Sequence, residues 1–352
     1  MDVQSVDPTV RERSPSALTP PPPRGPLSAR LIDVLATDAP ALLDLELDRA
    51  VADAVDLSDD ILLDDDLQLA LFLMYELSYG GIAGVADDWE WDASLLTARG
   101  RLEAAFEHAL RAAVAQPRAS RGVPEALFAL VADDSGPSLS AWVEHEADLE
   151  QVREILAARS IYTLKEADPH SWAIPRLKDA AKVALVEIQY DEYGSSRPDR
   201  MHATIFARCL RSVGLDDHYG AYLDHVPVLV LTSMNLMSLF GLHRRLRGAI
   251  VGHLAAYEMT SSLPCRAYAN GLRRLGLGED TTDYFDEHVA ADAVHEQIAA
   301  RDLAGGLAEA EPALADDILF GASACLTIDG MLWGGMRAAL AAGRSALRKS
   351  LT

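Results

Sequence analysis

Apolar residues recur at intervals of three or four positions along most of the chain, the spacing that gathers them on one face of an α-helix. Alternating polar and apolar residues beside Asn-Gly or Asp-Gly turns, the pattern of β-hairpins, are scarce. No segment recurs at a fixed interval. The pattern predicts an all-α fold with helical segments at residues 65–81, 96–115, 140–162, 201–215, 242–262 and 284–303.

Composition divides the chain into three parts. Residues 1–28 are rich in Pro and contain no apolar stretch, so we expect them to be disordered and to act neither as a signal peptide nor as a membrane anchor. Pro and Gly punctuate residues 116–128, which makes this stretch the best boundary in the chain. It would separate an N-terminal helical region, 29–125, from a larger region, 126–352.

The longest run without an ionisable side chain extends from Val226 to Leu242. It is only 17 residues long and carries four polar side chains. A membrane span needs about 20 predominantly apolar residues. We therefore expect a buried core helix here, and no membrane association.

Size and charge narrow the choice of partners. With 352 residues and 49% hydrophobic content, the chain can bury a sizeable core. The net charge of −23 argues against nucleic acid or an anionic membrane as a partner, since both attract clustered Lys and Arg. A small molecule or another protein is expected instead. The three cysteines, Cys209, Cys265 and Cys325, lie far apart outside any paired motif, which fits a reducing cytoplasm.

Candidate metal ligands occur in the last predicted helix, residues 284–303. Asp292 would lie about 40° to one side of His288 around this helix, and His295 about 20° to the other. Each of these residues alone is more often a surface or hydrogen-bonded group than a ligand. Together, two imidazoles and a carboxylate on one helix face form half of a metal site.

A second set of donors appears earlier in the chain. Glu192, Asp199 and His202 would span about 80° of one face if their helix were continuous. Gly194 and Pro198 interrupt that helix, so it either breaks before Pro198 or unwinds locally beside a metal. A further donor, Glu166, stands at an expected helix end just before a proline.

Charge balance agrees with a dinuclear centre. Two divalent cations need about four carboxylates to neutralise them when the other ligands are neutral imidazoles. The four expected carboxylates are Glu166, Glu192, Asp199 and Asp292. Ligands of this kind, without thiolate, suit iron or manganese. Glu258, in an apolar context, is a buried acid that would support the site or face the substrate, and we rank it below the ligands.

Three basic residues adjoin the proposed ligands in sequence: Lys165, Arg197 and Arg200. They are candidates to bind a substrate carboxylate. The alternative is that they are surface residues that offset the acidic composition.

These residues resemble the pattern of the haem-oxygenase-like di-iron oxidases and oxygenases, also described as iron-containing redox enzymes. The family pattern is one Glu, then Glu-x6-carboxylate-x2-His, then His-x3-Asp-x2-His. The matching positions here, in order and in spacing, are Glu166, Glu192, Asp199, His202, His288, Asp292 and His295. One departure is that Asp199 is shorter than the Glu of some members, which puts its reach to iron in doubt.

The resemblance implies a haem-oxygenase-like bundle of seven helices without haem, extended by an N-terminal helical region that mediates dimerisation in some members. It implies two Fe(II) per chain with O2 as co-substrate. A peroxo-di-iron intermediate would oxidise a small molecule, such as an amino acid, an amine or a fatty acid, in a biosynthetic pathway. An external electron donor is compatible with this chemistry.

Three alternatives remain open. A metal-free enzyme or small-molecule binding protein of the same fold would not need the histidines and carboxylates at this spacing. A haem protein would need one axial His and a broad apolar pocket. A non-enzymatic helical interaction protein would leave the stripe of ligands without a purpose.

Overall fold

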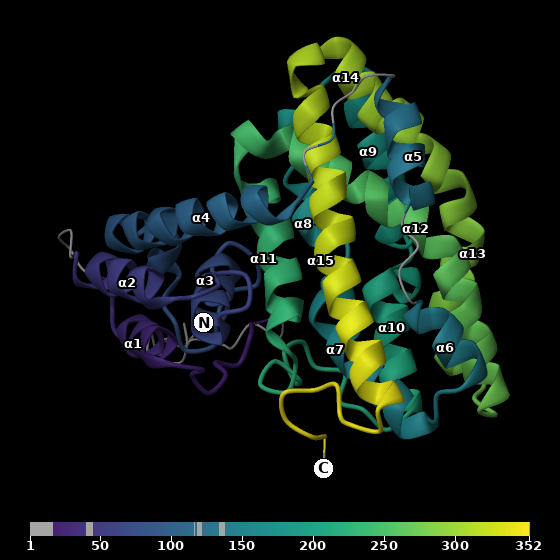
Figure 1. The fold of residues 1–352 in the computed structure, drawn as a ribbon, viewed down its shortest axis with the longest axis horizontal. Coiled ribbons are helices and arrows are strands. Elements are labelled where there is room, and N and C mark those ends of the chain that lie inside the picture. Colours follow the sequence, from purple (N-terminus) through teal and green to yellow (C-terminus); the bar gives the residue numbers. More distant parts are fainter. Residues whose placement is uncertain (1–16, 40–44, 116, 118–121, 134–137, 352) are drawn as a thin grey trace, which may run out of the picture.

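The computed structural model describes residues 17–39, 45–115, 117, 122–133 and 138–351 (Figure 1). The described residues form helices and connecting turns, and their β-structure is a single isolated bridge. The predicted all-α fold is confirmed. Its α-helices are α1 Pro26–Leu35, α2 Glu46–Leu57, α3 Asp65–Glu76, α4 Ala93–Ala113, α5 Val123–Asp133, α6 Leu139–His145, α7 Leu149–Thr163, α8 Asp168–Ser171, α9 Asp179–Glu192, α10 His202–Ser212, α11 Val228–Leu242, α12 Arg247–Arg274, α13 Glu279–Gln297, α14 Gly306–Ala310 and α15 Ala315–Ala341.

Acidic caps define where several of these helices begin. Asp64 accepts hydrogen bonds from two backbone amides of the first turn of α3, and Asp92 does the same for one amide of α4. Asp148 and Gln151 cap the start of α7 reciprocally. These side chains satisfy amide groups that have no partner inside the helix. The caps also explain why the predicted segment 140–162 divides into α6 and α7.

The main bundle is organised around α12, which packs against α13 and α15, while α10 packs against α13 (Figure 1). α12 and α15 approach closely because glycines stand at their crossing. A β-carbon at Gly252 would overlap the carbonyl oxygen of Ile318, and one at Gly321 would overlap that of Ala249. Only residues without a side chain allow this backbone contact.

α11, expected as a buried core helix, is predominantly apolar and is buried along most of its length. It lies between the main bundle and α3, so it joins the N-terminal helices to the rest of the fold (Figure 1). Among the described residues, α11 is too short to cross a membrane, and one segment, Pro312–Ala341, is long and apolar enough by length and composition. More than half of the most apolar stretch of this segment is buried inside the protein, and α15 packs on α11 and α12. The segment therefore belongs to the core of the bundle.

The N-terminal helices α1–α4 form a group beside the bundle (Figure 1). The predicted boundary at residue 125 falls inside α5, which packs on the bundle helices α12 and α15. The division of the chain into an N-terminal helical region and a larger region stays a prediction.

The expectation that residues 1–28 are disordered needs correction for its last part. Residues 1–16 lie outside the described residues, but Leu18 is fully buried and pairs with Ile82 in the isolated bridge. The buried Arg24 side chain donates hydrogen bonds to Asp65 and to the carbonyl oxygen of Leu223. Tertiary contacts made by a few residues have overcome the disordering effect of the prolines.

Candidate metal centre

His288 and His295 lie on one face of α13 and are buried, with 5% and 2% of their surface exposed. Nδ1 of His288 lies 2.7 Å from the carbonyl oxygen of Tyr284, one turn earlier. A carbonyl only accepts, so Nδ1 carries the proton and Nε2 keeps its lone pair. Nε2 lies 3.6 Å from Oε1 of Glu166. This is the tautomer and orientation that a metal-binding histidine requires.

The segment between Glu192 and His202 is a break between two helices. α9 ends at Glu192 and α10 begins at His202. Gly194 has a φ of 79° between them, and a β-carbon at this position would overlap the carbonyl oxygen of Arg197. Of the two alternatives for this segment, the structure contains the break before Pro198. The loop that interrupts the helix brings Nδ1 of His202 to 2.8 Å from Oε2 of Glu192.

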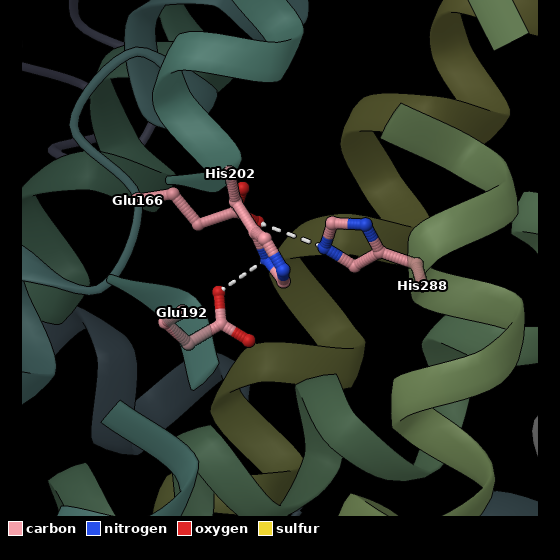
Figure 2. A group of neighbouring side chains, drawn as sticks. All are labelled: Glu166, Glu192, His202 and His288. Atoms are coloured by element: carbon pink, nitrogen blue, oxygen red, sulfur yellow. Dashed lines mark ion pairs between the residues drawn. The ribbon is translucent and has the colours of Figure 1, made fainter. Parts of the chain in front are cut away.

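One cluster consists of Glu166, Glu192, His202 and His288 (Figure 2). One donor atom from each residue lies within 4.8 Å of the others. The rings of His202 and His288 are tilted against each other with centroids 4.3 Å apart. The hydroxyl of Tyr284 donates to both oxygens of Glu166 at 2.9 Å, which orients this carboxylate. These four side chains could hold one metal ion.

A second cluster consists of Glu192, Glu258 and His295, again with donor atoms within 4.8 Å of one another. Nδ1 of His295 lies 3.4 Å from Oε2 of Glu258 on α12. Nε2 of the same ring lies 3.2 Å from Oδ2 of Asp191. Glu192 belongs to both clusters. His288 and His295 are about 10 Å apart along the axis of α13, which places them in different clusters.

Burial and neighbouring charges perturb these groups strongly. Burial raises the pKa of Glu258. It would do the same to Glu192, but His202 lowers the pKa of this carboxylate to about 2. Burial also opposes protonation of His295, yet Glu258 and then Asp191 raise its pKa to about 9. The buried carboxylates thus attract positive charge to this point, which is what a divalent cation would supply.

The donor set fits iron or manganese. All donors in the two clusters are carboxylates or imidazoles, and the buried thiols Cys209, Cys265 and Cys325 belong to neither. Nδ1 of His202 is buried without a hydrogen bond of good geometry, although it lies 2.8 Å from Glu192. A nitrogen that faces a carboxylate in this way is suited to share a metal with it.

The structure brings together five of the predicted ligands: Glu166, Glu192, His202, His288 and His295. The side chain of Asp292 lies outside the described residues. Asp199 is exposed in the short 3-10 turn Pro198–Arg200 and joins neither cluster. Its predicted position assumed a continuous helix, and the break after Glu192 removes that premise.

Glu258, which ranked below the ligands on sequence grounds, lies 3.4 Å from a ring nitrogen of His295 and belongs to the second cluster. One feature of the sequence could have identified Glu258 as a ligand candidate. It is an acid in an apolar stretch of helix, and no Lys or Arg stands three or four positions before or after it. A buried carboxylate of this kind needs a cation from elsewhere in the fold.

The three basic residues adjacent to ligands do not line the site. Lys165 forms a buried ion pair with Glu76, and Arg200 pairs with Asp283 and Glu287. Arg197 is exposed. The expectation that one of them binds a substrate carboxylate gains no support from their positions.

A small cavity adjoins the first cluster. It measures about 30 Å³, room for about two water molecules. Its described lining combines carboxylates, imidazoles, hydroxyls and one amide, without Lys or Arg: Tyr162, Glu166, Ala167, His170, Gln189, Glu192, Leu254, Tyr257, Glu258, Ser261 and His288. A third group of possible donors, Asp216, Asp217 and His218, lies at the surface, where such clusters are common without a metal.

Comparison with known proteins agrees with this geometry. A stretch of 149 residues is 31% identical to nitrosourea synthase from Streptomyces achromogenes subsp. streptozoticus, and it covers 42% of this chain. The match spans 31% of that enzyme, so the chain corresponds to about a third of its length. Residues 153–330, just over half of the chain, match the sequence profile of the family described as iron-containing redox enzymes. With every residue of both buried clusters inside this range, the chain belongs to the iron-containing redox enzyme family.

Proposed function

We propose that this protein is a non-haem, di-iron, O2-dependent oxidase or oxygenase of a small molecule. The observation that carries the proposal is the position of Glu192, which contributes to both buried clusters. A carboxylate has two oxygens and can hold one metal ion on each. Two half-sites that share one carboxylate are the arrangement by which helical bundles hold two iron ions.

Charge balance supports two metal ions. Glu166, Glu192 and Glu258 supply three negative charges in the two clusters. Asp292, which lies between His288 and His295 in the sequence, would supply the fourth. Four carboxylates neutralise two Fe(II), so that the pair of ions carries no net charge into the protein interior.

Bound ferrous iron would supply the electrons that activate O2, and the side chains supply its environment. Tyr284 holds both oxygens of Glu166 and, through its carbonyl, the ring of His288. These contacts fix two ligands before a metal arrives, which lowers the cost of binding. Burial of both clusters keeps bulk water from the reacting groups.

The substrate is proposed to be a nitrogen-containing small molecule, an amino acid or another amine, in preference to a fatty acid. The similarity to a nitrosourea synthase supports this choice. At about 30 Å³ the cavity accommodates O2 but not an amino acid, so the substrate requires the surrounding segments to open.

We further propose a cytoplasmic homodimer that takes part in a biosynthetic pathway and draws on an external electron donor. Exposed apolar side chains on the N-terminal helical region offer a surface for the second subunit. The largest exposures there are Leu57 at 83% and Trp91 at 77%. Sedimentation equilibrium of the wild type and of a Leu57→Ser, Trp91→Ser variant tests the dimer.

The decisive test is an anaerobic Fe(II) titration followed by stopped-flow mixing with O2. We expect two Fe(II) per chain and rapid O2 consumption. Glu258→Gln should reduce the count to one, because it removes one of three described donors of the second cluster. The control is His218→Ala at the exposed surface group, which should leave the count at two. Saturation of the wild type at one metal or none would reject the dinuclear proposal.

A further inference from the structure

A buried ion pair outside the two clusters connects the N-terminal helices to the metal site. Nζ of Lys165 donates to Oε1 of Glu76, the last residue of α3. The side chains of Lys165 and Glu76 are only 7% and 1% exposed. Tyr219 donates a second hydrogen bond to the same oxygen at 3.0 Å. Lys165 immediately precedes Glu166 in the chain.

Aromatic rings complete the surroundings of the ammonium group. It lies 3.9 Å from the ring centroid of Tyr79 and 5.3 Å from that of Tyr219. A cation above desolvated rings gains from their electron-rich faces. The ring centroid of Phe72 lies 5.6 Å away from the same ammonium group. Lys165 is therefore held at a defined place by one carboxylate and three rings, all from outside residues 163–171.

The turn that carries Glu166 is conformationally unusual and needs such support. Ala167 has a φ of 76°, which residues with a β-carbon rarely adopt. This conformation persists only where neighbouring contacts enforce it. On one side, Nε2 of Gln189 donates to the carbonyl oxygen of Ala167 at 2.8 Å. On the other side, the ion pair with Glu76 holds Lys165.

We propose that Glu76 is a positioning residue for the metal site: by binding Lys165, it fixes the turn that presents Glu166 to the first cluster. This inference rests on the proposed function for the identity of the ligand. Glu76 lies outside residues 153–330, the range that matches the family. The N-terminal helical region would thus contribute directly to the geometry of the site.

The ion pair can be broken without touching a ligand. Without Glu76, the ammonium of Lys165 would be buried unpaired, a state that a protein relieves by moving the group. The nearest alternatives along the chain are the carboxylates of Glu166 and Asp168. Either movement would displace Glu166 from the position that the turn now imposes.

The test compares Glu76→Gln, Lys165→Met and Lys165→Arg with the wild type. Two measurements are made. The first is amide hydrogen exchange of residues 163–168 in the metal-free protein, and the second is an anaerobic Fe(II) titration. We expect Glu76→Gln and Lys165→Met to speed exchange in this turn and to weaken Fe(II) binding at least tenfold. Lys165→Arg keeps the ion pair and should restore binding to near the wild-type value. A Co(II) absorption spectrum, altered only in the first two variants, would report the change in ligand geometry.

The matched control is Asp65→Asn, which breaks the ion pair between α3 and Arg24, also buried on the arginine side. It should lower the melting temperature without changing exchange in residues 163–168. Unchanged exchange and unchanged Fe(II) affinity in Glu76→Gln would overturn the inference. If Glu76→Gln does not fold, Tyr219→Phe replaces it, because this substitution removes one of the two hydrogen bonds to Oε1 of Glu76. It should also speed exchange in residues 163–168 and weaken Fe(II) binding, by smaller factors. If the wild type binds no Fe(II), the proposed function fails, and the exchange measurement still decides whether Glu76 anchors the turn.

Discussion

Acid should destabilise the metal-free protein in a pH range set by two buried imidazoles, His170 and His253. Nε2 of His170 lies 3.1 Å from Nδ1 of His253, and neither residue is more than 1% exposed. The other nitrogen of each ring is buried without a hydrogen-bond partner. Burial lowers the pKa of His170 from 6.5 to about 4, and burial lowers that of His253 well below its ordinary value.

The sign of the effect follows from where the proton binds more tightly. The folded pKa of His170 lies below the unfolded value, so the unfolded chain takes up the proton first as pH falls. The contribution of His170 to the free energy of unfolding is complete above pH 6.5 and is lost progressively as pH falls to about 4. The difference between the two pKa values corresponds to about 3 kcal/mol of unfolding free energy for His170, and His253 acts in the same direction. The total free energy of unfolding of a typical domain is only about 5–15 kcal/mol.

Urea unfolding in the presence of a chelator, repeated at several pH values between about 4 and about 8, measures the effect. His170→Gln should flatten the profile by about 3 kcal/mol over this range, whereas His218→Gln at the surface should not. His295 acts in a different range, because its raised pKa of about 9 makes its contribution disappear as pH rises above neutrality. Parallel profiles for the wild type and His170→Gln would refute the argument.

Two glycine substitutions test the packing that supports the site. Gly194→Ala should lower stability by about 1–3 kcal/mol and weaken Fe(II) binding, since it combines a positive φ with overlap at Arg197. The control is Gly214→Ala, because Gly214 also has a positive φ but has open space around it. Calorimetry should find a smaller loss of stability in this variant, and titration should find no loss of Fe(II) binding. Equal effects of the two substitutions would contradict the role of steric overlap. Gly252→Ala should cost about 2–5 kcal/mol by forcing α12 from α15, whereas Gly330→Ala, in open space on α15, should be neutral or stabilising in the same melting experiment.

The parts of the site that could be predicted from sequence depend on local geometry. His288 and His295 share a helix face because a helix fixes the direction of residues seven positions apart. Gly194 and Pro198 predicted an interruption of the helix, as a break or as a local unwinding, because their backbone preferences act wherever they occur. The helical segments could be predicted from the spacing of apolar residues, because each helix buries one face and that face carries the apolar residues.

Other parts depend on contacts between distant segments. Glu258 has no partner at helical spacing, and only the packing of α12 on α13 brings it to His295. The burial of Leu18 requires Ile82, and composition alone predicted disorder there. Glu76 was not singled out for the same reason, since it meets Lys165 only when α3 packs beside the bundle.

The break between α9 and α10 explains how Glu192 and His202 can serve one metal ion. On a continuous helix, residues ten positions apart are separated by about 15 Å along the axis, too far for their side chains to meet at one ion. A loop containing Gly194, Ser195 and Ser196, all with positive φ, instead interrupts the helix, and the two donor atoms lie 2.8 Å apart. Each non-glycine residue in this conformation costs about 1–3 kcal/mol. A regular helix would therefore be more stable locally, but it would separate Glu192, the carboxylate common to both clusters, from His202, one of its three neighbouring imidazoles.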